Sequence, residues 1–307
     1  MAPGSTLRYE VVEGWEQLPS GYVHRDVAGV ATDSEDRVYL ICRGDHPIIV
    51  YDAGGKFLRS WGQGEFTYRT HGITVGPDEM LYCTDDGNHT VRKFTPDGKL
   101  LLTLGTMNKP SDTGYDGKNT GTVSRPGTPF NRPTNLAVGP KGDLYVSDGY
   151  GNCRVHQYSS SGELKRSWGT PGGGPGEFFL PHGIAVAADG RVFVCDREND
   201  RIQVFRKSGE FVREFFVAKE TRQIGSVWDM VLSTDPEQTY MYVADGGNNL
   251  VRVLRRDTGV EVSAFGRNGR MAGQFHWVHN IAIDSKGNIY TAEVDTGKRL
   301  QRFTPAP

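Results

Sequence analysis

The sequence predicts an all-β protein, a six-bladed β-propeller that forms one domain over residues 1–307. Apolar and polar residues alternate with period two through many short runs, as in half-buried antiparallel strands. Turns rich in Gly, Asp and Asn separate these runs. The third observation is a four-strand unit of roughly 40–50 residues that recurs six times, the pattern of propeller blades. One blade cannot bury both of its faces, so we expect a single cooperative ring.

The six units begin at equivalent residues, which are Ala28, His71, Thr134, His182, Trp228 and His279. The clearest copy starts at His182 and reads strand, Asp-Gly turn, strand, polar turn, strand, Ser-Gly turn, strand. The sixth copy ends near Phe303 and is one strand short. We expect the isolated apolar run Leu7–Val12 to supply the missing strand, because such closure removes a free sheet edge.

Composition excludes several classes of protein. The formal net charge is −2 and the basic residues are scattered, so we expect no nucleic-acid partner. No apolar run reaches the ~18 residues of a membrane helix, so we expect no membrane partner. The first residues lack the pattern of a signal peptide, which favours a cytoplasmic protein. Its cysteines (Cys42, Cys83, Cys153 and Cys195) are then expected to be reduced thiols.

One long insertion, residues 106–133, interrupts the repeat and is rich in Gly, Pro, Ser and Thr. It connects the second unit to the start of the third. A long loop in a compact domain is often a functional lid, and a surface loop is the alternative. We expect a lid over the face on which the inner strands begin.

Histidine opens every second unit, at His71, His182 and His279. Equivalent positions of a six-fold ring surround the axis, so these three imidazoles should converge on one point. Three neutral imidazoles with room for a further ligand describe a catalytic zinc site. In the alternative interpretation each histidine only caps a nearby carbonyl. Four others are expected to be surface, structural or weaker candidates: His46, His89, His156 and His276.

The turns after the second strands lie on the same face as these histidines, because the second strand runs back towards the start of the first. Arg43 and Arg197 occupy one repeat position there, and Tyr150 follows the equivalent residue of the third unit. Arginine binds carboxylates through two parallel hydrogen bonds, which suits a small carboxylate-bearing substrate. Tyr150 could act as a base. The alternative is that each arginine pairs with a neighbouring acid, such as Asp45 or Glu198.

The units resemble NHL repeats, and the ordered set of segments RGDH, HGITV, VSDGYGN, LPH, DREN and VHN resembles peptidyl-α-hydroxyglycine α-amidating lyases. The resemblance covers nearly the whole chain. It implies zinc on the three strand-start histidines, Tyr150 as the base, and Arg43 and Arg197 as substrate-binding residues. It also implies a structural calcium ion held by backbone carbonyls, here those of Val30, Ile73 and Asn280.

The implied reaction cleaves the C–N bond of an N-(α-hydroxyalkyl) amide to an amide plus glyoxylate or another aldehyde. The chain departs from the family at Trp277. This residue is bulky, whereas the family has a smaller side chain lining the pocket there, and the difference favours substrates smaller than peptides. Two other functions stay open. One is a lactonase-like, metal-dependent propeller hydrolase, which usually binds its metal through Glu, Asn and Asp. The other is a non-enzymatic NHL interaction module.

Overall fold

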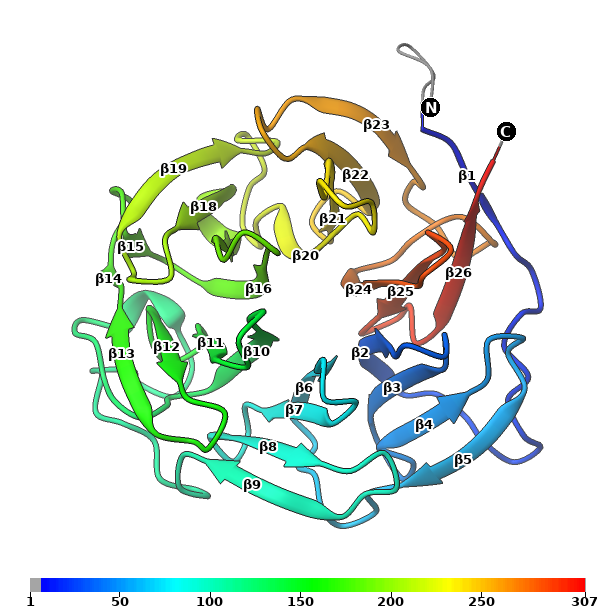
Figure 1. Ribbon diagram of the computed structural model, residues 1–307, viewed down its shortest axis with the longest axis horizontal. Coiled ribbons are helices and arrows are strands. Elements are labelled where there is room, and N and C mark those ends of the chain that lie inside the picture. The colour runs from blue at the N-terminus through cyan, green and yellow to red at the C-terminus, as the bar shows by residue number, and fades with distance from the viewer. Residues whose placement is uncertain (1–6, 307) are drawn as a thin grey trace.

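The computed structural model describes residues 7–306, and its strands form a ring of six four-stranded antiparallel sheets (Figure 1). This confirms the predicted six-bladed propeller. Each blade begins with an inner strand beside the axis, and five of the six proceed outward in chain order, whereas the N-terminal strand is outermost in the sixth. No helix among the described residues is long and apolar enough to cross a membrane.

The first three blades follow the chain without interruption of the strand order. The strands of the first blade are β2 (Asp26–Thr32), β3 (Val38–Arg43), β4 (Ile48–Tyr51) and β5 (Phe57–Trp61). Those of the second are β6 (Thr70–Val75), β7 (Leu81–Asp85), β8 (Thr90–Phe94) and β9 (Leu100–Leu104). Those of the third are β10 (Pro133–Val138), β11 (Leu144–Asp148), β12 (Arg154–Tyr158) and β13 (Leu164–Trp168).

The remaining blades complete the circle. The fourth contains β16 (Pro181–Val186), β17 (Val192–Asp196), β18 (Arg201–Phe205) and β19 (Phe211–Phe216). The fifth contains β20 (Val227–Leu232), β21 (Tyr240–Asp245), β22 (Leu250–Arg255) and β23 (Glu261–Phe265). The sixth contains β24 (Val278–Ile283), β25 (Ile289–Glu293), β26 (Leu300–Pro305) and β1 (Tyr9–Val11). Minor elements are the parallel pair β14 (Thr170–Pro171) and β15 (Glu177–Phe178), and the 3-10 turns η1 (Thr120–Thr122) and η2 (Arg197–Asn199).

The N-terminal strand closes the ring as predicted. β1 pairs antiparallel with β26, Tyr9 opposite Pro305 and Val11 opposite Phe303, and the two strands lie side by side in Figure 1. The chain then crosses to the first blade, where a Cβ on Gly55 (φ +88°) would lie 1.9 Å from the Trp15 carbonyl oxygen. Glycine is needed there both for the backbone conformation and for this close approach.

A β-bulge interrupts every inner strand at the residue that opens the repeat. In β24, for example, Val278 pairs with Glu293 and Asn280 with Ala292, so His279 has no partner in the ladder. The other five inner strands have the same irregularity. A bulge adds an unpaired residue and re-aims its side chain. In three blades the bulged residue is a histidine, so the repeat and the bulge together direct three rings towards the axis.

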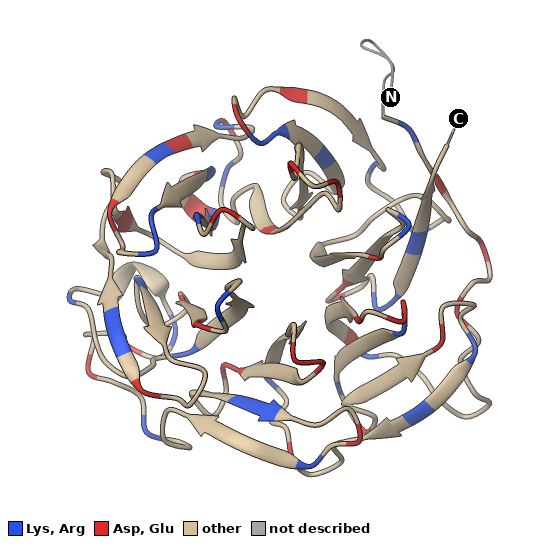
Figure 2. Ribbon diagram, in the orientation of Figure 1, with Lys and Arg blue, Asp and Glu red and all other residues tan. Residues whose placement is uncertain are grey.

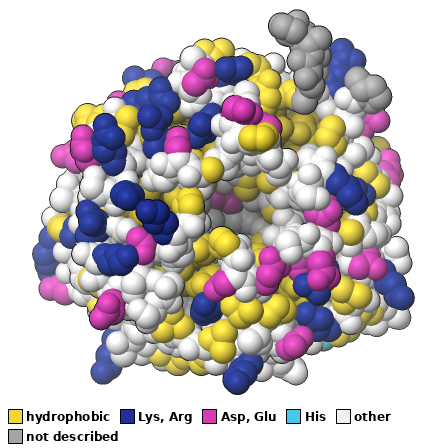
Figure 3. Space-filling model, viewed as in Figure 1, with side chains coloured by type: hydrophobic (Ala, Val, Ile, Leu, Met, Phe, Trp, Pro, Cys, Tyr) yellow, Lys and Arg dark blue, Asp and Glu magenta, His cyan; other side chains and the backbone are white. Residues whose placement is uncertain are grey.

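The inner strands surround a cavity of about 520 Å³ that opens at the centre of the ring, where Figure 3 shows a hollow. Apolar side chains line its middle, namely Val30, Ile73, Leu136, Ile184, Met230 and Ile281. Charged residues of both signs are interspersed around the ring in Figure 2, in keeping with the net charge of −2.

Candidate metal centre

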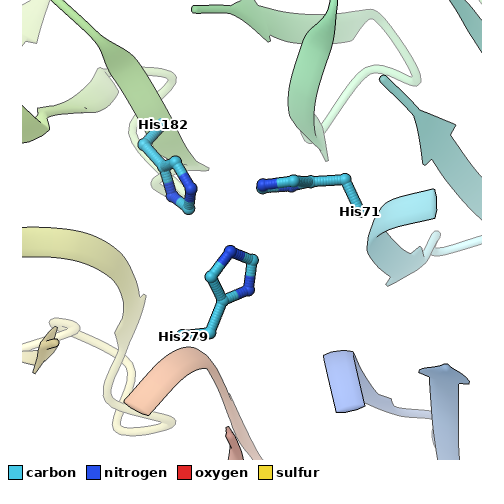
Figure 4. A group of neighbouring side chains, drawn as sticks. All are labelled: His71, His182 and His279. Atoms are coloured by element: carbon cyan, nitrogen blue, oxygen red, sulfur yellow. The ribbon is translucent and has the colours of Figure 1, made fainter. Parts of the chain in front are cut away.

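His71, His182 and His279 come together at the axis and point towards one another (Figure 4). One nitrogen from each lies within 4.8 Å of the other two. All three side chains are buried, and the ring centroids lie 4.6 to 4.9 Å apart. In the part of the chain that the structure describes, this is the one group of three or more His, Cys, Asp or Glu side chains placed to hold a metal ion.

The intervening blades fix the orientation of the three rings. The Nδ1 atom lies 2.6 Å from the carbonyl oxygen of Thr134 in His71, 2.6 Å from that of Trp228 in His182, and 2.7 Å from that of Ala28 in His279. A carbonyl oxygen only accepts, so each Nδ1 carries the hydrogen. The lone pair of a neutral ring is then on Nε2, the tautomer that binds a metal. Thr134, Trp228 and Ala28, which open the other three blades, thus orient the histidine rings through their backbone carbonyl oxygens.

The three imidazoles are held neutral. Burial is the main cause that keeps the pKa of His71 well below its ordinary value, followed by the neighbouring His279 and His182. Burial also lowers the pKa of His182 and His279, and the nearby arginines act in the same direction. No carboxylate hydrogen-bonds to these rings in the described residues. Neutral imidazoles with converging lone pairs are ligands that suit zinc.

Tyr150 reaches this centre from the turn after β11. Its hydroxyl oxygen lies 3.2 Å from Nε2 of His71 and 3.1 Å from Nε2 of His182. The preceding Gly149 allows this approach, because a Cβ there would lie 2.1 Å from the carbonyl oxygen of Pro181. One phenolic hydrogen cannot satisfy two Nε2 lone pairs, and a third lone pair comes from His279. The donor set is therefore that of a cation site with a hydroxyl group beside it.

Arg197 also belongs to the centre. The side chain is buried, and its guanidinium carbon lies 3.6 Å from the centroid of the Trp228 ring. Nε donates to the carbonyl oxygen of Ile224 at 2.7 Å and Nη1 to the Tyr150 hydroxyl at 3.4 Å. It forms no ion pair with any described acid, and burial lowers its pKa. A buried guanidinium without an acidic partner, next to the three histidines, is a place where an anionic group can bind.

Arg43 occupies the equivalent turn of the first blade but is already paired. Nη1 lies 3.0 Å from Oδ2 of Asp26, and Nε donates to the carbonyl oxygen of Thr70 at 3.1 Å. The pairing acid is thus neither of the neighbours that the sequence suggested. Trp277 has φ +52° and lies beside Trp228, with ring centroids 5.8 Å apart. Its indole therefore borders the aromatic surface on which Arg197 stacks.

Sequence reasoning missed two further arginines of this face. The guanidinium carbons of Arg69 and Arg132 each lie 5.6 Å from the centroid of the Tyr150 ring. Both side chains bind the buried carboxylate of Asp86. A signal was present in the repeat: both arginines stand two residues before the residue that opens their blade, the position that Trp277 holds in the sixth.

The predicted calcium ligands lie farther along the channel. Val30, Ile73 and Asn280 line the central cavity together with Asp229. Oδ1 of Asn280 accepts a hydrogen bond from the Val30 N–H at 2.7 Å, and Nδ2 donates to Asp229 Oδ2 at 2.5 Å. Asn135 donates to the other oxygen of Asp229 at 3.2 Å. Carbonyl oxygens suit calcium, and the hydrogen bonds just described use side chains and an N–H, not the predicted carbonyls. The calcium site stays a prediction.

The insertion 106–133 reaches this face through Arg132, which lies against the Tyr150 ring and donates from Nη1 to the Tyr115 hydroxyl at 2.8 Å. The other histidines make contacts away from the axis. His46 stacks on Tyr22 and the buried His156 contacts Asp148, while Nδ1 of His89 accepts the Arg132 N–H at 3.1 Å. The four cysteines lie buried as free thiols.

Comparison with known proteins identifies the family to which the chain is related. The NHL repeat model matches residues 130–158 and 180–205. NHL repeat-containing protein 3 of Homo sapiens is 30% identical, over 97% of this chain and 85% of its own length. Peptidyl-alpha-hydroxyglycine alpha-amidating lyase 1 of Drosophila melanogaster is 32% identical over 82% of this chain, and peptidylglycine alpha-amidating monooxygenase of Rattus norvegicus is 31% identical over 94%. The chain spans 47% and 33% of these two proteins, respectively.

Solved structures show the same architecture. A streptogramin B lyase superimposes with a TM-score of 0.62 at 11% identity and covers 98% of both chains. A virginiamycin B lyase from Staphylococcus aureus gives a TM-score of 0.63 at 14% identity, over 97% of this chain and 99% of the other. At such low identity, the likeness extends to the fold alone.

Proposed function

Since the chain belongs to the family of NHL-repeat β-propellers, we propose that it is a zinc-dependent lyase. The proposed substrates are small, carboxylate-bearing N-(α-hydroxyalkyl) amides, and the products are an amide and glyoxylate or another aldehyde. The observation that carries the proposal is the position of the Tyr150 hydroxyl, within 3.2 Å of two Nε2 atoms and 3.4 Å from Arg197. Relatives named as amidating lyases support the same reaction class.

A zinc ion on Nε2 of His71, His182 and His279 would supply Lewis-acid polarisation of a substrate oxygen. Tyr150 is the group placed to move a proton. Acting as the phenolate, it takes the proton of the α-hydroxyl as the carbonyl forms and the C–N bond breaks, and it returns that proton to the departing amide nitrogen. Atoms and charge balance without water, so the reaction is an elimination and not a hydrolysis.

Arg197 binds the α-carboxylate in this proposal. The stack on Trp228 and the bond to the Ile224 carbonyl hold its guanidinium in place, and no described acid competes for it. A guanidinium that is already fixed loses little conformational entropy when an anion binds to it. Its hydrogen bonds to that anion are also stronger in a buried site than in water. Arg43 adds a second guanidinium, but Asp26 and the Thr70 carbonyl already occupy two of its donors. We therefore assign it the smaller contribution to carboxylate binding.

The similarity to NHL repeat-containing protein 3, a name that states no activity, favours the interaction module as a second candidate. A product assay distinguishes the candidates. The protein is incubated with α-hydroxyhippurate and with N-acetyl-α-hydroxyglycine, as purified, after chelation, and after zinc is restored. A lyase releases equal amounts of glyoxylate and amide, loses activity on chelation and regains it with zinc. Release of an acid and an amine would indicate a hydrolase instead. If no substrate of this class yields glyoxylate under any condition, the lyase proposal is wrong.

A further inference from the structure

The first two blades hold charge-reversed versions of the same ion pair. Asp26 and Arg69 occupy one repeat position, and Arg43 and Asp86 occupy another. In the first blade Arg43 Nη1 lies 3.0 Å from Asp26 Oδ2. In the second, Nε and Nη2 of Arg69 each donate to Asp86 at 2.9 Å. Each pair is neutral, so the reversal alone adds no net charge to this face.

The third blade adds an arginine without adding an acid. Nη2 of Arg132 lies 3.0 Å from Asp86 Oδ1, and its Nε lies 3.3 Å from the same oxygen. Asp86 is fully buried and is the only acid that either guanidinium pairs with among the described residues. Two guanidinium ions thus share one carboxylate, which leaves one positive charge without a partner. Within residues 7–306, Nη1 of Arg69 makes no hydrogen bond, and this side chain is 44% exposed.

These guanidiniums line a cavity of about 430 Å³. Asp86 lines it from the second blade, and Tyr115 and Arg132 line it from the insertion 106–133. The cavity adjoins the metal centre, because the guanidinium carbons of Arg69 and Arg132 both lie 5.6 Å from the centroid of the Tyr150 ring. A molecule that reacts beside Tyr150 can therefore extend into it.

We infer that this cavity is a subsite for a second carboxylate, and that Arg69 is its specificity-determining residue. The assignment of the two ends of the substrate rests on the proposed function. With the α-carboxylate on Arg197, the N-acyl group on the other side of the scissile bond extends past Tyr150 to Arg69 and Arg132. The preferred substrates are then dianions, N-acyl-α-hydroxyglycines whose acyl chain ends in a carboxylate. A carboxylate there would meet the unshared positive charge and the open Nη1 donor.

Equilibrium binding tests the subsite apart from the reaction. N-succinylglycine and N-succinamoylglycine lack the α-hydroxyl and are not cleaved, and they differ only in a terminal carboxylate or carboxamide. Calorimetry on the metal-loaded protein should show about tenfold tighter binding of the carboxylate at low ionic strength, a difference of about 1.4 kcal/mol. Added salt should reduce this preference. Arg69→Gln should bring it within about twofold, and Arg69→Lys should retain part of it. Arg25→Gln, a change to an exposed arginine near Tyr68, is the matched control and should leave it unchanged.

Equal binding of the two ligands by the wild-type protein would overturn the inference, as would a full preference in Arg69→Gln. If Arg69→Gln does not fold, Arg69→Lys and the salt series on the wild-type protein decide. Glyoxylate release from N-succinyl- and N-succinamoyl-α-hydroxyglycine is measured separately. Anion-selective binding without glyoxylate would sink the lyase proposal and leave the subsite. Glyoxylate release from both substrates at equal kcat/KM, with equal binding of the two ligands, would overturn the subsite and leave the lyase proposal.

Discussion

Two groups of buried histidine side chains can be compared in this propeller, because their surroundings shift the pKa in opposite directions. At the axis, burial keeps the pKa of His71, His182 and His279 below its ordinary value, and neighbouring imidazoles and arginines act in the same direction. Beside the N-terminal segment, burial alone would also lower the pKa of His24. Hydrogen bonds with Cys42 and Glu16 outweigh it and raise the pKa to about 10. The Nε2 atom of His24 lies 2.7 Å from Glu16 Oε1.

The difference lies in the partners, since both regions are buried. At the axis the three rings face each other and several arginines, and their Nδ1 atoms bind backbone carbonyls that carry no charge. Such rings keep their Nε2 lone pairs for a cation. His24 has a carboxylate within hydrogen-bonding distance and forms a structural ion pair. Burial of a histidine therefore does not identify a metal ligand, whereas several neutral rings with converging Nε2 lone pairs do favour a metal site.

The largest expected effect follows the removal of one axial ring. His279→Ala should lose the metal, and activity should fall by about 10³-fold or more, because a Lewis acid contributes several kcal/mol to the transition state. Elemental analysis and glyoxylate release measure the two losses. His46→Ala, which removes a ring that stacks on Tyr22, is the control and should keep both. Full metal content in His279→Ala would contradict the assignment of this ring as a ligand.

Tyr150→Phe should lower kcat by about 10²–10⁴-fold, the range for loss of a general base. The metal content should stay at the wild-type level, because the three rings and their carbonyl partners are unchanged. This variant therefore separates the proton-transferring group from the cation site. Near-wild-type turnover on every α-hydroxyamide that the protein accepts would show that another group takes the proton.

Arg197 and Arg43 should differ in effect because only Arg43 has an acidic partner. Hydrogen bonds to charged groups contribute about 1.5–3 kcal/mol, so Arg197→Ala should lower kcat/KM by roughly 10- to 150-fold. Most of this loss should appear in KM if the arginine anchors the ground state. Arg43→Ala should have a smaller effect. Thermal unfolding of both variants controls for stability, and a larger loss for Arg43→Ala would reverse the assigned roles.

The smallest expected effect is a change in the free energy of unfolding when His24 is replaced. Its folded pKa of about 10 is above the unfolded value of 6.5, so its contribution is complete below pH 6.5 and is lost as pH rises towards 10. His24→Gln should therefore be less stable at pH 6 by about 1–3 kcal/mol, and the gap to the wild type should close near pH 10. Urea unfolding at several pH values measures the gap. A gap that is independent of pH would show that the imidazole is not charged.

The fold could be predicted from the sequence because a blade is a local pattern. Period-two strands and glycine-containing turns recur at equal spacing, and the short sixth repeat indicated that the run Leu7–Val12 would close the ring. The convergence of His71, His182 and His279 followed from the same spacing, since equivalent positions of a closed ring surround one axis. The family resemblance added roles for Tyr150, Arg43 and Arg197, and these roles stay predictions.

Contacts between blades, in contrast, join residues far apart in the chain, and no local pattern specifies them. The lack of an acid at Arg197 and the approach of Arg132 to Asp86 of the second blade depend on how the turns of neighbouring blades meet. The sequence by itself determined which three blades place a histidine at the axis, because the repeat and its bulge are local. Only the tertiary structure decided which charges stay unpaired there, because that depends on packing across the ring.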